Sequence, residues 1–408
     1  MLLKGNCLEL LAEMPDNSVD SIVTDPPYEL GFMGKSWDNS GIAYSVELWS
    51  QALRVLKPGG HLLAFGGSRT YHRLASAVED AGFEIRDQIM WIYASGFPKS
   101  LNIAKSIENK ITTGSAAKNG FHKLEGERTG EGRIGMYDTV EEQGFRKVNP
   151  NQLGAFNLDP TTPEAQQWQG WGTALKPAHE PIVVARKPLI GTVATNVLTY
   201  GTGALNIDGS RVGTIDALGR WPANVIHDGS EEVLEGFPNS KSGKPGVRLS
   251  DGFNSGVYGT GMGIKSGQDN GEYGDSGSAA RFFYCAKASK SERNAGLDIE
   301  QFPLKNYTEA NKMGGAGDTM LTGSGNPRDS RKQNFHPTVK PIALMRYLVK
   351  LVTPPNGTVL DPFLGSGTTA VAAILEGFNW MGCEMTEDYW PIIEARVAWA
   401  EAQPKTLL

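Results

Sequence analysis

Residues 358–377, TVLDPFLGSGTTAVAAILEG, decide the fold. The segment TVLD predicts a strand, and TTAVAAILEG predicts a helix that begins near Thr368. Gly365 and Gly367, which lie between them, allow a tight turn and a close approach of the backbone to a ligand. The first N–H groups of the helix point at that ligand, and no Lys follows the glycines as it would in a phosphate-gripping P-loop. The pattern predicts a nucleotide-type turn, and an ordinary strand–helix turn is the alternative.

The next predicted strand supports the nucleotide interpretation. It is NWMGCEM, residues 379–385, and it carries Glu384 near its end. Glu384 lies 23 positions after Asp361. A Rossmann-like site places its ribose-binding carboxylate at about this distance from the glycine turn.

Both ends of the chain alternate strands with helices. The predicted class is therefore α/β, a Rossmann-like, doubly wound and mostly parallel sheet. A stop at Lys57-Pro58-Gly59-Gly60 is expected to separate the first of these helices from the strand HLLAF. The predicted strands are 18–24, 61–65 and 84–93, and the predicted helices are 44–56, 69–81, 341–353 and about 388–402.

The middle of the chain is irregular and holds most of the glycine, of which the sequence has 50 residues. We expect residues 1–112 and 336–408 to form two halves of one domain, with a target-recognition region over 113–335. Apolar segments at about 180–186 and 280–287 are expected to return to the sheet as core strands. Trp168 and Trp171 argue against a plain flexible linker.

A second motif, Asp25-Pro26-Pro27-Tyr28, follows the predicted strand at 18–24. Open α/β sheets bind ligands at this carboxyl edge. The motif suits an exocyclic amine, whose lone pair is conjugated into a ring. The Asp25 carboxylate and the Pro26 carbonyl can each accept one amine N–H, and Tyr28 offers a flat face on which a base can stack. The alternative is a strand-terminating turn with a solvated Asp.

Together the motifs resemble those of the amino-group DNA methyltransferases that use S-adenosylmethionine. DPPY is similar to their catalytic motif, DPFLGSGTT to their cofactor motif, and HPTVKP (336–341) to an element that closes over the methionine end of the cofactor. The order is permuted, with the catalytic motif first, as in the β class. The segments GRWPANVIHDGS (219–230) and RFFYCAKASKSERNAGL (281–297) resemble those of phage and prophage members.

The resemblance implies a set of functional residues. It places Glu384 on the ribose hydroxyls and Asn6, where many members have Asp, on the adenine of the cofactor. The implied catalytic residues are Asp25, Pro26, Pro27 and Tyr28. The implied cofactor-binding residues are Asn6, Cys7, His336, Pro337, Thr338, Lys340, Asp361, Pro362, Phe363, Gly365, Ser366, Gly367, Thr368 and Glu384.

The implied reaction is methylation of the adenine N6 amine in double-stranded DNA, after the base has flipped out of the helix. Cytosine N4 is the alternative, since cytosine-directed members more often begin the motif with Ser. A catalytically silent DNA-binding module and a dinucleotide oxidoreductase are the alternatives from other classes. The β class also implies a homodimer. No endonuclease motif is evident in the sequence.

The formal net charge of −6 argues against a histone-like DNA binder, so contact with DNA must come from local charge. Residues 281–350 hold 12 Lys and Arg against 6 Asp and Glu. Residues 91–99, WIYASGFPK, carry Phe97 and Pro98 after the predicted strand, where a wall for a flipped base would lie. The DNA-binding candidates are Lys287, Lys290, Arg293, Arg331 and Lys332.

The remaining signals concern metals, disulfides and location. Three cysteines are too few for a disulfide framework, and the histidines show no metal-ligand spacing, so no metal is expected. No apolar run approaches the length of a membrane span, and the first residues do not resemble a signal peptide. These signals predict a cytoplasmic protein with no membrane partner.

Overall fold

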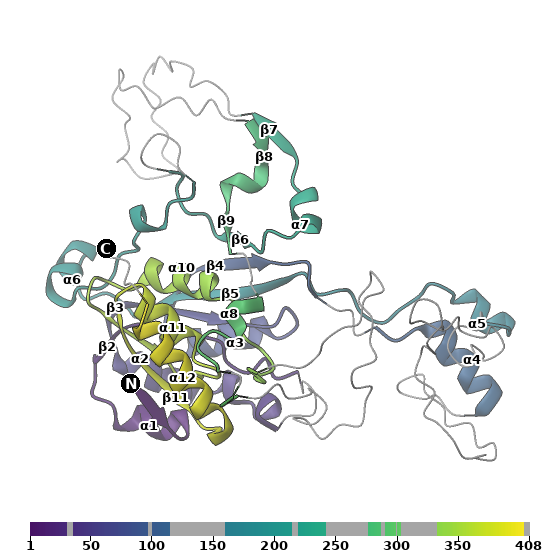
Figure 1. Cartoon of the computed structure of the whole chain (residues 1–408), viewed down its shortest axis with the longest axis horizontal. Helices are drawn as coiled ribbons and strands as arrows, with labels where there is room; N and C mark the ends of the chain where they lie inside the picture. The colour runs from purple at the N-terminus through teal and green to yellow at the C-terminus, as the bar shows by residue number, and fades with distance from the viewer. Residues whose placement is uncertain are drawn as a thin grey trace. The chain divides into compact units, whose positions relative to one another are not determined.

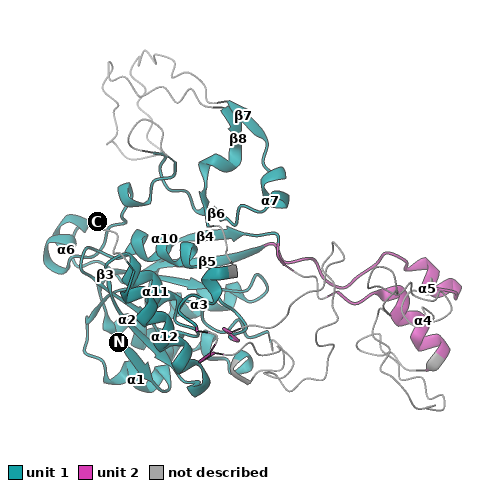
Figure 2. Ribbon diagram, viewed as in Figure 1, with its two compact units in different colours: residues 1–94, 179–297, 336–408 teal, residues 95–178, 298–335 magenta. Residues whose placement is uncertain are grey.

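The computed structural model forms two compact units, which are shown in Figure 2. Unit 1 contains residues 1–94, 179–297 and 336–408, and unit 2 contains residues 95–178 and 298–335. The structure describes residues 1–30, 36–96, 100–114, 160–213, 219–241, 276–286, 290–298, 300–302 and 333–403.

Unit 1 is built on a nine-stranded sheet (Figure 1). Strand β5 runs antiparallel to both of its neighbours, and the other neighbouring pairs are parallel. Because β5 is reversed, its first residues lie at the sheet edge where the parallel strands end. Across the sheet the strands are β1 (Leu2–Lys4), β11 (Asn379–Glu384), β10 (Thr358–Asp361), β2 (Val19–Thr24), β3 (Leu56–Phe65), β5 (His179–Arg186), β4 (Glu84–Ile92), β6 (Val225–His227) and β9 (Tyr284–Cys285).

Helices cover both faces of this sheet. Apolar side chains of α1, α2 and α3 share one buried cluster with the sheet, and those of α10 and α11 share another. The predicted doubly wound, mostly parallel α/β fold is confirmed. The helices of unit 1 are α1 (Cys7–Glu13), α2 (Val46–Val55), α3 (Tyr71–Asp80), α6 (Val193–Tyr200), α7 (Glu231–Glu235), α8 (Lys290–Arg293), α10 (Ile342–Val352), α11 (Thr368–Leu375) and α12 (Trp390–Glu401), with short 3-10 turns at Ser36–Asn39, Ile42–Tyr44, Asp208–Ser210, Ala279–Phe282 and Glu387–Tyr389.

The beginning of β3 differs from the prediction. The sequence Lys57-Pro58-Gly59-Gly60 was expected to end a helix before a strand at 61–65, but β3 already begins at Leu56. The two glycines make this possible. Gly59 has a φ of +76°, and a Cβ on Gly60 would lie 2.9 Å from the Asp20 carbonyl oxygen. The pairing of β2 with β3 shifts register at this point, so the segment is an irregular strand and not a helix stop.

The two predicted returns to the sheet have different lengths. The apolar segment at 180–186 forms β5, which is almost entirely buried. The segment at 280–287 contributes only the two-residue strand β9 after a 3-10 turn.

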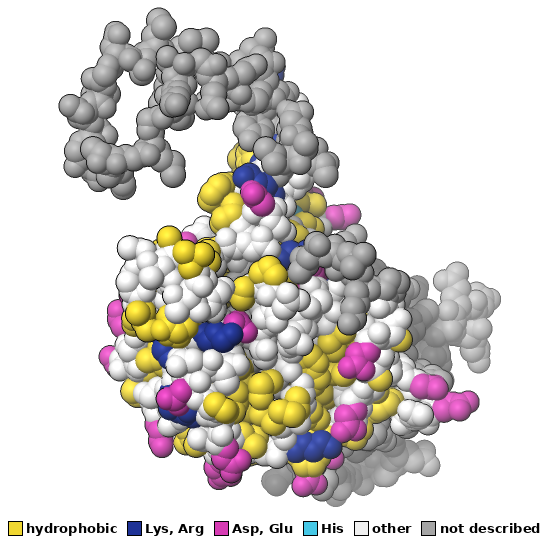
Figure 3. Space-filling model, turned by 90° about the vertical axis from the view of Figure 1, so that its left-hand side faces the viewer, with side chains coloured by type: hydrophobic (Ala, Val, Ile, Leu, Met, Phe, Trp, Pro, Cys, Tyr) yellow, Lys and Arg dark blue, Asp and Glu magenta, His cyan; other side chains and the backbone are white. Residues whose placement is uncertain are grey.

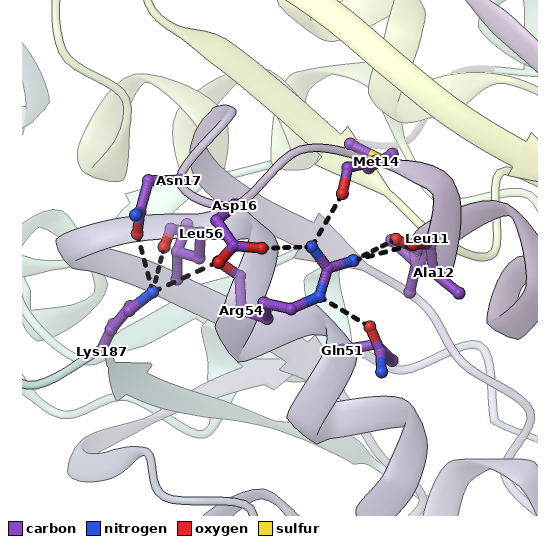
Figure 4. Close-up of polar contacts among 9 residues, drawn as sticks. All are labelled: Leu11, Ala12, Met14, Asp16, Asn17, Gln51, Arg54, Leu56 and Lys187. Atoms are coloured by element: carbon purple, nitrogen blue, oxygen red, sulfur yellow. Dashed lines mark hydrogen bonds and ion pairs between the residues drawn. The ribbon is translucent and has the colours of Figure 1, made fainter.

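A polar cluster fixes the end of α1 and the start of β3 (Figure 4). The Arg54 guanidinium, from α2, donates to the carbonyl oxygens of Leu11 at 2.6 Å and Met14 at 2.8 Å. The Lys187 ammonium donates to the Leu56 carbonyl oxygen at 2.7 Å. These backbone acceptors belong to helix and strand ends, where side chains commonly supply hydrogen bonds.

Smaller elements complete the chain. Unit 2 holds α4 (Ile103–Thr113) and α5 (Pro163–Gln167), which pack together, with Trp168 and Trp171 edge-to-face at 5.1 Å. In unit 1, β7 (Asn239–Lys241) and β8 (Ser276–Ser278) form a separate two-stranded sheet. On the face of unit 1 drawn in Figure 3, Lys and Arg side chains are scattered and do not form a basic patch. No helix in the described part of the chain is both long and apolar enough to cross a membrane.

Candidate active site

The two sequence motifs meet at the carboxyl edge of the sheet. Asp25 directly follows β2, and Asp361 ends β10, the parallel neighbour of β2. The Thr24 hydroxyl donates to Asp361 Oδ1 at 2.6 Å, which joins the two strand ends. The structure therefore brings the predicted catalytic and cofactor motifs side by side.

Asp361 is buried, and both of its oxygens accept hydrogen bonds. Oδ1 accepts from Thr24 and from the Phe363 amide at 3.0 Å, and Oδ2 accepts from the Thr369 hydroxyl at 2.5 Å. Burial raises the pKa of Asp361 to about 6 despite these three donors. Asp361 thus anchors both ends of the glycine turn.

The glycine turn is closed from both sides. Gly365 has a φ of +57°, and a Cβ on it would lie 2.9 Å from His336 Nε2. Gly367 has a φ of +81° and precedes α11, whose first turn has no side-chain cap. Any larger residue at 365 would collide with the His336 ring, so this position requires glycine.

Glu384, at the end of β11, supports the same turn. Its Oε2 accepts from the Gly365 amide at 2.8 Å, and its Oε1 accepts from the Thr386 amide at 2.7 Å. Burial raises the pKa of this carboxyl. The adjacent strand β1 leads to Asn6, whose side chain caps α1 by accepting from the Leu8 amide at 2.9 Å, and then to the buried Cys7. Asn6, Cys7, Gly365 and Glu384 therefore lie near one edge of the sheet.

The 336–341 segment lies over the turn. The buried His336 ring contacts Tyr389 edge-on at 4.6 Å between centroids, and its Nδ1 lies 3.0 Å from the Thr338 carbonyl oxygen and 3.3 Å from the Thr338 amide nitrogen. Burial, reinforced by nearby cations, lowers the pKa of His336 to about 3, so the ring is neutral at pH 7. Pro337 is half-buried and Thr338 is exposed.

Lys340 reaches the catalytic motif. Its ammonium is 2.5 Å from Asp25 Oδ2 and 3.3 Å from Glu180 Oε2. Burial alone would lower the pKa of Lys340, but Asp25 and Glu180 outweigh that effect and raise it. Sequence reasoning grouped Lys340 with the cofactor residues, whereas the charged end of the side chain pairs with Asp25.

The other oxygen of Asp25 has no such partner. Oδ1 is buried and accepts no hydrogen bond from the described residues. Burial raises the pKa of Asp25 and Glu180 adds to the rise, while Lys340 and, more weakly, the nearby Tyr28 hydroxyl oppose it. A buried carboxylate oxygen without a donor is costly, and such an atom commonly has a functional explanation.

Comparison with known proteins identifies the family. A family described as DNA methylase, of the N6/N4 type, matches residues 19–395. The chain belongs to the N6/N4 DNA methylase family.

The curated relatives to which the chain is similar include the following three proteins. It is 42% identical over 80 residues to Type II methyltransferase M.ScaI of Streptomyces caespitosus, 44% over 63 residues to putative methylase YubD of Escherichia coli K12, and 33% over 105 residues to Type II methyltransferase M.HpaI of Haemophilus parainfluenzae. These stretches cover 20%, 15% and 24% of the chain, and 26%, 28% and 33% of the relatives. The chain therefore matches only about a third or less of the length of each relative.

Solved structures match nearly the whole chain at low identity. The M1.HpyAVI–SAM complex is 13% identical, covers 97% of this chain and 98% of its own, and has a TM-score of 0.39. The PvuII cytosine-N4-specific DNA methyltransferase is 14% identical, covers 100% and 87%, and has a TM-score of 0.45.

The glycine turn is also held by a residue that the sequence analysis missed. Arg396, on α12, is fully buried, and its Nη1 donates to the Ser366 carbonyl oxygen at 2.6 Å, to Ser366 Oγ at 3.0 Å and to Thr368 Oγ1 at 3.1 Å. Burial, reinforced by nearby Arg293, lowers the pKa of Arg396 to about 10. A lone Arg within an apolar helix was the available signal.

Glu180 was missed as well. It is the second residue of β5, and its Oε2 accepts from the Tyr28 hydroxyl at 2.8 Å. A charged residue just before the apolar run of this strand was the signal in the sequence. Its proximity to Asp25 depends on the reversed direction of β5, which the sequence pattern does not give.

The DNA-binding candidates are only partly described. Lys287, Arg331 and Lys332 lie outside the described residues, as do Phe97 and Pro98. Lys290 opens α8, and its side chain is likewise not described. Arg293 donates to the His336 carbonyl oxygen, so at least one of its N–H groups serves the 336–341 segment. No cluster of three His, Cys, Asp or Glu that could hold a metal ion occurs among the described residues.

Proposed function

We propose that this chain uses S-adenosylmethionine to methylate the N6 amino group of adenine in double-stranded DNA. The observation that carries the proposal is the bare, buried Oδ1 of Asp25 at the carboxyl edge of the sheet. An amine N–H is the donor that this oxygen lacks. Membership of the N6/N4 DNA methylase family supports an amine of DNA as the acceptor of the methyl group.

The residues at the glycine turn fit the proposed cofactor. A Cβ at position 365 would collide with His336, so the turn carries glycine, which has no side chain, at this position. No side chain caps the first turn of α11. Glu384 uses one lone pair of each oxygen on a backbone amide, which leaves acceptors for ribose hydroxyls. We assign Asn6, Glu384 and the 361–368 turn to the nucleoside, and His336, Pro337 and Thr338 to the methionine end.

S-adenosylmethionine would supply a methyl group carried on a positively charged sulfur. The amine nitrogen would form a bond to this methyl group as the methyl–sulfur bond breaks, which would release S-adenosylhomocysteine, and the nitrogen would then give one proton to water. Asp25 Oδ1 accepts one N–H of the amine, and the Pro26 carbonyl accepts the other. This pairing favours a pyramidal nitrogen with a free lone pair. Tyr28 stacks against the base, which has to leave the duplex to reach the site.

Adenine is preferred over cytosine because the motif begins with Asp. The basic residues between 287 and 332 are assigned to DNA phosphates, which predicts that binding weakens as salt rises. A homodimer is expected from the β-class order of the motifs, and light scattering measures it directly.

Methyl transfer tests the proposal. The chain is incubated with DNA from a methylation-free host and labelled S-adenosylmethionine. The Asp25→Ala variant is expected to bind the cofactor with unchanged affinity in calorimetry and to incorporate no label above background. Full incorporation by this variant would exclude Asp25 from the reaction.

A further inference from the structure

One carboxylate oxygen of Glu180 contacts Tyr28 directly and is linked to Asp25 through Lys340. Glu180 Oε2 accepts from the Tyr28 hydroxyl at 2.8 Å and lies 3.3 Å from the Lys340 ammonium. That ammonium is 2.5 Å from Asp25 Oδ2. The side chains of Asp25 and Glu180 are each 18% exposed and that of Lys340 is 9% exposed, so water screens these charges weakly.

We propose that Glu180 is a positioning residue for amino-group methylation, which holds Lys340 and Tyr28 so that Asp25 keeps one oxygen for the target amine. The inference rests on the proposed function, because it assigns a purpose to that bare oxygen.

The geometry gives Glu180 this role because a lysine ammonium has three N–H donors. In the structure the ammonium lies between the two carboxylates, on Oδ2 of Asp25 and Oε2 of Glu180. Without the second carboxylate, the ammonium can turn onto both oxygens of Asp25. Lys340 would then occupy Oδ1 and compete with the amine.

The charge of the cluster supports the same role. Asp25 and Glu180 are two acids and Lys340 is one base, so the three carry one net negative charge when ionised. The target nitrogen becomes positively charged as it takes the methyl group, and a neighbouring net negative charge stabilises it. Replacing Glu180 with Gln makes the cluster neutral.

Of the titratable groups around this cluster, the nearby tyrosines and His336 are uncharged at neutral pH, whereas Asp361 is ionised. Burial raises the pKa values of Tyr28 and Tyr93, and the pKa of His336 is about 3, so these three are neutral. Asp361, on β10, has a pKa of about 6 and is ionised at pH 7, where it adds to the negative potential. Glu180 and Lys340 thus have opposite effects on Asp25: the first raises its pKa and the second lowers it.

Three variants test the role of Glu180. Single-turnover methyl transfer to DNA is measured between pH 5 and 8, with cofactor binding measured by calorimetry as a check of the fold. Glu180→Gln is expected to lower the plateau rate about 10–100-fold, the scale of one buried charged hydrogen bond. The acid limb of the profile, which is the fall in rate as Asp25 becomes protonated, is expected to move to lower pH. Glu180→Asp keeps the charge, so its limb stays near that of the wild type. Lys340→Met is expected to move the limb to higher pH.

Glu84→Gln is the matched control. Glu84 begins β4 and binds Arg186 at 2.6 Å, at the opposite end of the β4–β5 ladder from Glu180. This variant removes the same charge from the same sheet and is expected to match the wild type in rate and pH profile.

The outcomes separate the inference from the proposed function. If the wild type transfers no methyl group to DNA, the proposed function fails and this inference fails with it. If the wild type is active and Glu180→Gln matches Glu84→Gln, only the inference is overturned. A lower rate with an unmoved acid limb also overturns it, because general structural damage lowers a rate without changing the pKa of Asp25.

Discussion

Asp25 and Asp361 follow neighbouring parallel strands of one sheet, and their oxygens are used differently. The two oxygens of Asp361 accept three hydrogen bonds from its own surroundings. Asp25 pairs one oxygen with Lys340 and leaves the other bare. Burial raises the pKa of both carboxyls.

An aspartate thus has two different roles at the carboxyl edge of this sheet. A carboxylate whose oxygens are satisfied within the protein fixes backbone, as Asp361 fixes the turn that carries Gly365. A carboxylate with a free oxygen is available to a ligand and costs stability until the ligand arrives. Three sets of variants test whether bonded groups at this edge hold the fold while Asp25 serves the reaction.

The largest effect is expected for Asp25→Asn, because it removes the charge next to the proposed target amine. The methyl-transfer rate should fall about 10²–10³-fold, as when one preorganised electrostatic contact is lost from an active site. Asp20→Asn is the control, since Asp20 lies in β2, the strand that Asp25 follows, and both of its oxygens are bonded within the protein. Single-turnover assays at saturating cofactor measure both. Equal losses would show that the bare oxygen of Asp25 has no special role.

A smaller effect, on stability, is expected for Asp361→Asn. The pKa of Asp361 is about 6 in the fold and 3.8 in an unperturbed chain. Its proton therefore contributes stability that is fully present below about pH 4 and is lost as pH rises through 6. The free energy of unfolding of the wild type, relative to the variant, should fall by up to about 3 kcal/mol between pH 4 and 7. Urea unfolding at several pH values measures this difference, and a constant difference would contradict it.

The smallest effect separates two glycines. Gly365 and Gly377 both have positive φ, so Ala at either position should cost about 1 kcal/mol of unfolding free energy. Only the Cβ at 365 meets His336, since no atom lies within 4 Å of one at 377. Gly365→Ala should therefore weaken binding of S-adenosylmethionine about tenfold in calorimetry, as expected for a displacement worth about 1.4 kcal/mol. Gly377→Ala should leave binding unchanged, and equal affinities would remove the role assigned to the turn.

The sequence predicted the parts of the fold that depend on local patterns. The β10–turn–α11 segment and the strands β2, β4 and β11 lie near their expected positions, because short apolar runs and glycine turns encode them locally. The beginning of β3 was wrong, because Gly59 and Gly60 permit an irregular strand as readily as a helix stop.

The site was predictable to the same extent. The meeting of Asp25 with Asp361 follows from two parallel strands that end at one edge. The contact of Glu180 with Tyr28 depends on β5 running antiparallel, and the contact of Arg396 with Ser366 depends on how α12 packs; neither is a local property of the sequence.

The most direct test of the account is the mass of the modified nucleoside. DNA from a methylation-free host is incubated with the wild type or with Asp25→Ala and S-adenosylmethionine, and is then digested to nucleosides. We expect N6-methyladenine with the wild type and none with Asp25→Ala. N4-methylcytosine, unmodified DNA, or N6-methyladenine from both proteins would contradict it.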